Sequence, residues 1–213
     1  MKTLIYVGAN RGFGLYRLLQ KRQFDVIYAF EPDPEMFEQL KTNYSNVPQI
    51  TCINAACSKE TGPKTLYITE NRVSSSLSDV NMSNQEQFGG HSGGKPAFKT
   101  TEIHSVNLKE FCMINNIKHI DMLVTDCQGS DYEILTTMKE FIDEKRIDEL
   151  FCETHQDGVE MYVGLDNTFS QFKSILGENY KVSHFSADGH HIDANNLTEL
   201  NKHMEWDTSW KLL

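Results

Sequence analysis

The chain has 213 residues, of which 39% are hydrophobic and 23% are charged, and its formal net charge is −10. This length and composition predict one globular domain with a full core, spanning residues 1–213. The negative charge argues against binding to nucleic acid, which needs a basic face, and no apolar stretch approaches the ~20 residues of a membrane helix. We therefore expect a soluble protein with neither a nucleic-acid nor a membrane partner.

The first part of the chain alternates strand-like and helix-like segments. A short apolar run at 3–7 predicts a buried strand that ends in a glycine-rich turn. Leu15, Leu18 and Leu19 then share one face of a helix over 14–22. In order, the next segments are a strand at 25–33, a helix at 34–44, and strands at 49–57 and 64–70.

Residues 71–100 differ from the rest of the chain, because they are rich in Ser, Asn, Gln and Gly and contain few apolar positions. An irregular span of this length inside a compact domain is usually either functional or disordered. We interpret residues 71–100 as a lid or substrate loop of the single domain.

Regular segments return after residue 100. In order, they are a helix at 105–116, a strand at 119–126, a helix at 130–142, a strand at 147–155, a helix at 167–176, a strand at 180–186, and a last edge strand within 203–213. This alternation predicts an α/β fold with a mostly parallel, doubly wound sheet and an antiparallel C-terminal edge strand.

A parallel sheet of this kind binds its ligand at the carboxyl ends of its strands, near the point where the strand order reverses. Polar or glycine-rich segments follow five of the expected strands, and we expect them to meet at that edge. These segments are Gly8–Gly12, Glu31, Asn54–Ser58, Asp126–Gly129 and Glu153–Asp157.

The cysteines and histidines give no metal-binding pattern. The odd set of five cysteines contains no C-x-x-C pair, so we expect free thiols and a reducing, cytoplasmic location. A cation site from His155, Asp157, His190, His191 and Asp193 can be imagined, but adjacent histidines point apart on a strand and no helical H-x-x-x-H spacing occurs. We therefore expect no metal.

The turn "YVGANRGFG" at 6–14 suits two different cofactors. Its glycines match the turn that holds a dinucleotide in short-chain dehydrogenases, and "VGANRG" equally matches the first motif of S-adenosylmethionine (SAM)-dependent methyltransferases. Glu31 stands at the end of the second strand, where a carboxylate accepts hydrogen bonds from ribose hydroxyls. Both cofactors carry a ribose, so Glu31 indicates a nucleoside without choosing between them.

The dehydrogenase interpretation requires a catalytic Tyr with a Lys four positions later, because the Lys lowers the pKa of the phenol. None of the eight tyrosines has a Lys at that position. The sequence therefore lacks the catalytic Tyr–Lys pair that the dehydrogenase interpretation requires.

Five segments in order resemble the FkbM-type methyltransferase family. They are "VGANRG" at 7–12, "FEPDPEMFEQL" at 30–40, "NAACS" at 54–58, "SSSL" at 74–77 and "HIDMLVTDCQGSDYEIL" at 119–135. The family usually has Lys where this chain has Thr125 and Glu where it has Gln128. The resemblance runs from about residue 3 to 155 and implies a Rossmann-like fold, SAM as cofactor and methyl transfer.

The chemistry of methyl transfer and the positions of these segments give several residues an expected role. Asp126 and His155, which follow neighbouring expected strands, are the candidates for a general base, and Asp126 also for pairing with the amino group of SAM. Ser74–Leu77 would contact the cofactor, and Phe88–Phe98 would close over the acceptor. The expected cofactor-binding residues are Gly8, Asn10, Gly12, Glu31, Pro32, Asn54, Ala56, Ser58, Ser76 and Asp126.

The resemblance also implies the acceptor, a hydroxyl group on a small molecule or a glycan. Two alternatives stay open. The same scaffold supports N-methylation of an amine, which relaxes the need for a general base. The departures at Thr125 and Gln128 are also compatible with a non-catalytic domain that binds SAM or a nucleoside.

Overall fold

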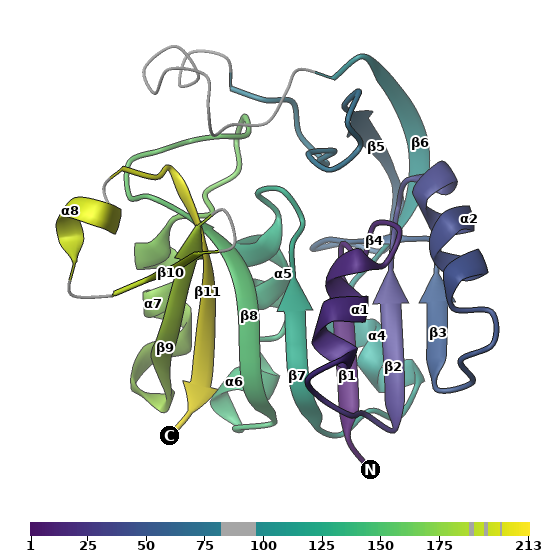
Figure 1. Ribbon diagram of the computed structural model, residues 1–213, viewed down its shortest axis with the longest axis horizontal. Helices are drawn as coiled ribbons and strands as arrows, with labels where there is room; N and C mark the ends of the chain where they lie inside the picture. Colours follow the sequence, from purple (N-terminus) through teal and green to yellow (C-terminus); the bar gives the residue numbers. More distant parts are fainter. Residues whose placement is uncertain (82–96, 188–189, 194–195, 201) are drawn as a thin grey trace.

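The computed structural model describes residues 1–81, 97–187, 190–193, 196–200 and 202–213. Its strands form one sheet of eight and a second sheet of three (Figure 1). The strands of the large sheet are β1 (Thr3–Val7), β2 (Val26–Phe30), β3 (Ile50–Ile53), β7 (Ile120–Thr125), β8 (Ile147–His155), β9 (Tyr180–Ala187), β10 (His190–Ile192) and β11 (Glu205–Leu212). The small sheet comprises β4 (Ala56–Cys57), β5 (Gly62–Ile68) and β6 (Lys99–Val106).

The helices connect the strands and cover both faces of the large sheet. They are α1 (Phe13–Leu19), α2 (Pro34–Asn43), α4 (Leu108–Ile114), α5 (Asp131–Thr137), α6 (Lys139–Asp143), α7 (Phe169–Leu176), α8 (Leu197–Leu200) and the 3-10 helix η1 (Gly177–Asn179). Local sequence sets several of their starts. Asp33, for example, caps α2 by accepting a hydrogen bond from the Glu35 backbone N–H at 2.9 Å, and Pro34 follows at the first helical position.

The large sheet is mostly parallel and runs in the order β10-β9-β11-β8-β7-β1-β2-β3. The five strands from β3 to β8 pair in parallel, and β11, β9 and β10 pair antiparallel to their neighbours. The expected Rossmann-like α/β architecture is therefore confirmed.

Alternation along β1 shows how the sheet is buried on both faces. Ile5 and Val7 pack into a core formed with α4, α5, α6 and α7. Leu4 and Tyr6 point the other way and pack with residues of α1 and α2. A strand with apolar residues on both faces reads as a continuous apolar run, which is why 3–7 is recognisable in the sequence.

The strand order reverses at β1, which has β2 on one side and β7 on the other. The carboxyl ends of β1 and β7 therefore lie side by side, and Gly8 follows one while Asp126 follows the other. Gly8 adopts a φ of 82°, and a Cβ on it would lie 1.9 Å from the backbone oxygen of Asp126. Only glycine fits where these two turns cross.

Three expected elements differ from the structure. The run at 49–57 is two strands, because β4 leaves the large sheet and pairs with β6. The helix expected at 105–116 begins only at Leu108, since residues up to Val106 continue β6 and Asn107 caps α4. The helix expected at 130–142 is divided at Met138 into α5 and α6.

The expectation that the C-terminal strand lies at the edge of the sheet was wrong. β11 is antiparallel, as expected, but it lies between β8 and β9, and β10 forms that edge. Burial explains the difference, because Trp206, Thr208, Ser209 and Trp210 all have less than a tenth of their surface exposed.

The small sheet stands beyond the carboxyl ends of β1, β2 and β3, so it overhangs the edge where a ligand is expected (Figure 1). The span expected to be a lid enters this sheet, since β6 begins at Lys99. Residues 82–96, including Phe88, lie outside the described residues. No helix within the described ranges combines the length and the apolar character needed to cross a membrane.

Candidate functional site

A cavity of about 230 Å³ opens where the strand order reverses. The turn after β1 contributes Gly8 and Asn10 to its wall, the end of β2 contributes Glu31, and the turn after β7 contributes Asp126 and Gln128. The sequence analysis expected the segments that contain all five residues to meet at one edge, and it named four of them, all but Gln128, as cofactor-binding candidates. The fold brings all five together.

The opposite wall of the cavity is largely apolar. Ala56, Cys57 and Leu66 of the small sheet line it together with Leu77. Ser130 also lines the cavity, and its buried hydroxyl has no hydrogen-bond partner among the described residues. An apolar wall beside unpaired polar groups suits a ligand that combines an aromatic ring with hydrogen-bonding groups.

Glu31 is the most enclosed carboxylate of the cavity wall, with 5% of its surface exposed. The backbone N–H of Asn10 donates to its Oε2 at 2.7 Å and that of Asp33 to its Oε1 at 2.8 Å. Burial raises the pKa of Glu31 to about 7, and the two backbone hydrogen bonds oppose this shift. Each carboxylate oxygen keeps accepting capacity for a ligand hydroxyl.

Asn10 holds the apex of the glycine-rich turn in the left-handed region, with a φ of 49°. Its side-chain Oδ1 accepts from the Arg11 backbone N–H at 2.9 Å, and its Nδ2 donates to the Arg72 carbonyl at 2.7 Å. The turn is thus tied both to Glu31 and to the loop that follows β5.

Gly12 is not part of the cavity wall. Its φ is 93°, and a Cβ there would lie 2.3 Å from Cε2 of Tyr44, whose hydroxyl donates to the Gly12 carbonyl at 2.7 Å. The expectation that Gly12 allows close approach of a cofactor therefore needs correction, because here glycine makes room for Tyr44.

Asn54 and Ser58 also lie outside the cavity wall. Asn54 Nδ2 donates to the backbone carbonyls of Glu31 and Pro32 at 2.8 and 3.3 Å, so it braces the end of β2. Ser58 is buried and accepts a hydrogen bond from Ser105 Oγ at 2.8 Å. These placements do not support direct hydrogen bonds to adenine, whereas Pro32 does line the cavity.

Arg72 is a wall residue that the sequence analysis missed. Its Nη1 donates to both carboxylate oxygens of buried Asp33, at 2.9 and 2.7 Å, and its Nη2 lies 2.5 Å from Glu35 Oε2. This clamp fixes the loop after β5 to the start of α2. The sequence signal for Arg72 was weak, because a single arginine in a polar segment is common and does not by itself indicate a binding site.

Ser76 is placed at the cavity, as expected, and links two of its walls. Its hydroxyl donates to the Gln128 carbonyl at 2.6 Å. Gln128 in turn donates from Nε2 to Asp126 Oδ1 at 3.1 Å and accepts from the Tyr162 hydroxyl at 2.8 Å. Gln128 therefore fixes the orientation of Asp126.

Asp126 is the exposed carboxylate at the end of β7. Desolvation raises the pKa of the Asp126 carboxyl above its ordinary value, and the hydrogen bond from Gln128 opposes this shift. Among the described residues, no side chain or backbone N–H donates a hydrogen bond to Asp126 Oδ2, so this oxygen is available to a ligand.

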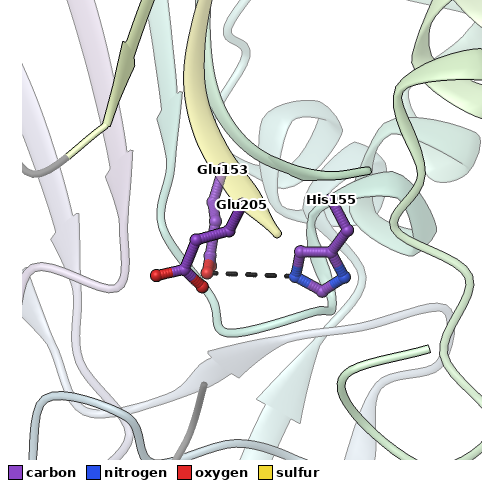
Figure 2. A group of neighbouring side chains, drawn as sticks. All are labelled: Glu153, His155 and Glu205. Carbon is purple, nitrogen blue, oxygen red and sulfur yellow. Dashed lines mark ion pairs between the residues drawn. The ribbon is translucent and has the colours of Figure 1, made fainter. Parts of the chain in front are cut away.

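His155 does not reach the cavity wall. It ends β8 fully buried, and burial lowers its pKa to about 4, so the imidazole is neutral at pH 7. Its Nε2 lies 3.9 Å from Glu153 Oε1, and Glu205 stands beside both (Figure 2). This placement does not support the expected role of His155 as a base that touches an acceptor.

One protein family and several solved structures are similar to this chain. Residues 7–190 match the methyltransferase FkbM domain. The crystal structure of methyltransferase FkbM from Methylobacillus flagellatus KT is similar at a TM-score of 0.54 and 13% identity, covering 99% of this chain and 43% of that one. This chain therefore spans less than half of the length of that protein. No curated protein matches the chain significantly in sequence.

Two further solved structures are similar at lower scores. TrmK from M. capricolum, in complex with S-adenosyl-homocysteine, has a TM-score of 0.49 and 12% identity, covering 99% of this chain and 62% of that one. An rRNA methylase from Streptococcus thermophilus has a TM-score of 0.49 and 8% identity, covering 100% of this chain and 87% of that one.

The chain has a Rossmann-like fold with a cavity at the strand-order reversal. The chain belongs to the methyltransferase FkbM domain family, which confirms the resemblance seen in the sequence.

Proposed function

We propose that this protein transfers a methyl group from SAM to a hydroxyl group of a small molecule or glycan. The observation that carries the proposal is the position of buried Glu31 in the cavity beside the glycine-rich turn. Family membership supports the type of reaction, and the acceptor class rests on the resemblance of the sequence to FkbM-type enzymes.

The cavity residues fit SAM group by group. Glu31 has accepting capacity for the ribose hydroxyls, and Ala56, Leu66 and Leu77 offer an apolar surface for adenine. Asp126 has a carboxylate oxygen available for the ammonium group of the methionine moiety. The unpartnered hydroxyl of Ser130 adds one more hydrogen-bonding group on the same wall.

When bound, SAM supplies a methyl carbon already activated by the neighbouring sulfonium charge. The protein's main task is then to align the acceptor oxygen with that carbon and to keep water out. An alcohol is a weak nucleophile near neutral pH and benefits from a base that takes its proton. Asp126 is our candidate for this role, since it lines the cavity and buried His155 does not.

A methyl-transfer assay tests this proposal. The protein is incubated with SAM carrying a labelled methyl group and a panel of glycans, polyketide alcohols and matched amines. We expect label in a hydroxyl-bearing acceptor, and slower labelling at subsaturating SAM when Asp126 is replaced by Ala. Label only in amines would make the enzyme an N-methyltransferase, and tight SAM binding with no label across the panel would favour a domain that binds SAM without turnover.

We further propose that the protein works in the cytoplasm on an acceptor that is not a nucleic acid. The net charge of −10 and the five free cysteines support this setting. Addition of tRNA or rRNA to the same assay should yield no labelled nucleic acid.

A further inference from the structure

Four polar side chains share one face of the sheet where β8 and β11 run antiparallel. His155 is paired with Glu205 across the strands, and Glu153 is paired with Asp207. Residues two apart on a strand point to the same face, so Glu153, His155, Glu205 and Asp207 form one group. The sequence did not indicate this group, because the two strands are far apart along the chain.

His155 is the unusual member of this group. Its side chain has no exposed surface, and neither ring nitrogen has a hydrogen-bond partner among the described residues. Leaving a buried polar group unpaired normally costs free energy, so such a group usually has an additional partner. Figure 2 shows that one ring nitrogen faces the carboxylates of Glu153 and Glu205.

Glu153 is held so that one oxygen faces His155. Both the backbone N–H and the side-chain Nε2 of Gln128 donate to Glu153 Oε2, at 3.0 and 3.2 Å. The other oxygen, Oε1, lies 3.9 Å from His155 Nε2. One donor atom from each of Glu153, His155 and Glu205 can be chosen so that all three lie within 4.8 Å of one another.

Further carboxyl groups surround this group. Asp126, Asp131 and Asp207 contribute electrostatically to the environment of Glu153. Among the ion pairs formed by the described residues, none joins a lysine or arginine to Glu153 or to these three aspartates. A bound cation would favour the ionised form of these carboxyl groups.

We propose that Glu153, His155 and Glu205 bind one divalent transition-metal ion. Donor atoms about 2.1 Å from a metal ion and at right angles to each other are about 3 Å apart. The three donor atoms lie within 4.8 Å of one another, so the side chains must move closer together to reach this arrangement. Gln128 then orients the Glu153 carboxylate by donating hydrogen bonds to its Oε2, as residues that contact metal ligands do in other metal sites.

The ligand set indicates which ions this site prefers. Two carboxylates and one imidazole suit Mn²⁺, Fe²⁺ or Zn²⁺, whereas Ca²⁺ and Mg²⁺ favour sites made of oxygen alone. We therefore expect Mn²⁺ and Zn²⁺ to bind more tightly than Mg²⁺.

Cation binding does not depend on the proposed methyl transfer, so the two can fail separately. The two sites are nevertheless linked, since Gln128 Nε2 donates to Glu153 Oε2 and also to Asp126 Oδ1. Whether the ion assists methyl transfer rests on the proposed function, and the test of the metal site uses binding alone.

The test measures Mn²⁺ binding to the metal-free protein through loss of the electron paramagnetic resonance signal of free Mn²⁺. We expect one ion per chain, with affinity at least tenfold weaker in each of His155→Leu and Glu205→Gln. The control is Asp148→Asn, because Asp148 and His119 form an exposed pair at 3.0 Å at the other end of β8. Its affinity should stay within about twofold of that of the unchanged protein.

Thermal unfolding gives a second readout. At a hundredfold excess of Mn²⁺ over Kd, Tm of the unchanged protein should rise by about 5–10 °C. Glu205→Gln should show little of this rise, and metal-free His155→Leu should melt no lower than the unchanged protein, because the substitution removes unpaired buried nitrogens. The proposal is overturned if neither Mn²⁺ nor Zn²⁺ binds saturably, if binding persists in Glu205→Gln, or if Asp148→Asn loses it equally.

Discussion

Glu31 shows how a single carboxylate in this cavity couples the stability of the fold to pH. Burial raises the pKa of Glu31 from an ordinary value of 4.5 to about 7. Between pH 4.5 and pH 7, Glu31 is therefore mostly protonated in the folded protein and mostly ionised in the unfolded chain. The stabilisation from this group is complete below the unfolded pKa and is lost as pH rises through 7. We expect the ligand-free protein to lose about 1–3 kcal/mol of unfolding free energy from Glu31 between pH 5 and pH 8.

Urea unfolding at several pH values measures this loss. Glu31→Gln is the matched variant, because it keeps the shape of the side chain and cannot ionise. Its unfolding free energy should vary less between pH 5 and pH 8 than that of the unchanged protein. An identical pH dependence in both proteins would show that Glu31 is ionised throughout this range.

Asp126 carries two proposed roles that Asp126→Asn separates. If Asp126 pairs with the ammonium group of SAM, the variant should bind SAM more weakly, and saturating SAM should largely restore the rate. If it takes the proton of the acceptor, affinity should hold while kcat falls by about 10²–10⁴-fold. We expect mainly the first pattern, since methyl transfer depends mostly on alignment. Unchanged affinity with unchanged kcat would remove Asp126 from the site.

At the scale of elements, the loop after β5 is fixed to α2 by one buried ion pair. Arg72 donates two hydrogen bonds to Asp33, and only 1% of the surface of Asp33 is exposed. Asp33 also caps α2. Removing one partner leaves a buried carboxylate without its cation. We expect Arg72→Met to lower the unfolding free energy by about 2–4 kcal/mol in urea unfolding.

A double variant distinguishes lost pairing from lost packing. Asp33→Asn keeps a side chain that caps helices well and removes the buried charge, so it should restore part of the stability of Arg72→Met. A loss below about 0.5 kcal/mol in Arg72→Met, or no recovery in the double variant, would contradict the proposed clamp.

At the scale of the whole molecule, β11 is an interior strand of the large sheet and not an edge strand. It pairs with β8 on one side and β9 on the other, and β10 forms the edge of the sheet. Strands paired on both sides open only with large parts of the fold. In native-state hydrogen exchange, we expect amides of β11 to exchange as slowly as those of β7 and much more slowly than those of β10. Equal rates in β10 and β11 would contradict this order of strands.

The sequence was informative where a functional residue directly follows a buried strand. Gly8, Glu31 and Asp126 each end an apolar run, so the parallel sheet brings them together by its topology alone. The position of β11 was not predictable, since it depends on a hairpin of β9 and β10 packing outside it. The Arg72 clamp and the pairing of His155 with Glu205 were missed for a similar reason, because they join segments that only tertiary contacts bring together.

The central claim is that this cavity binds SAM. Calorimetry with S-adenosyl-homocysteine, the demethylated product, tests this claim most directly. The unchanged protein should bind one molecule per chain, while NADH should show no measurable binding. Glu31→Ala removes acceptors for two ribose hydroxyls, each hydrogen bond to a charged group being worth about 1.5–3 kcal/mol, so its affinity should fall at least tenfold with the fold retained. Tight binding of NADH, or normal binding of the product by Glu31→Ala, would contradict the assignment of this cavity.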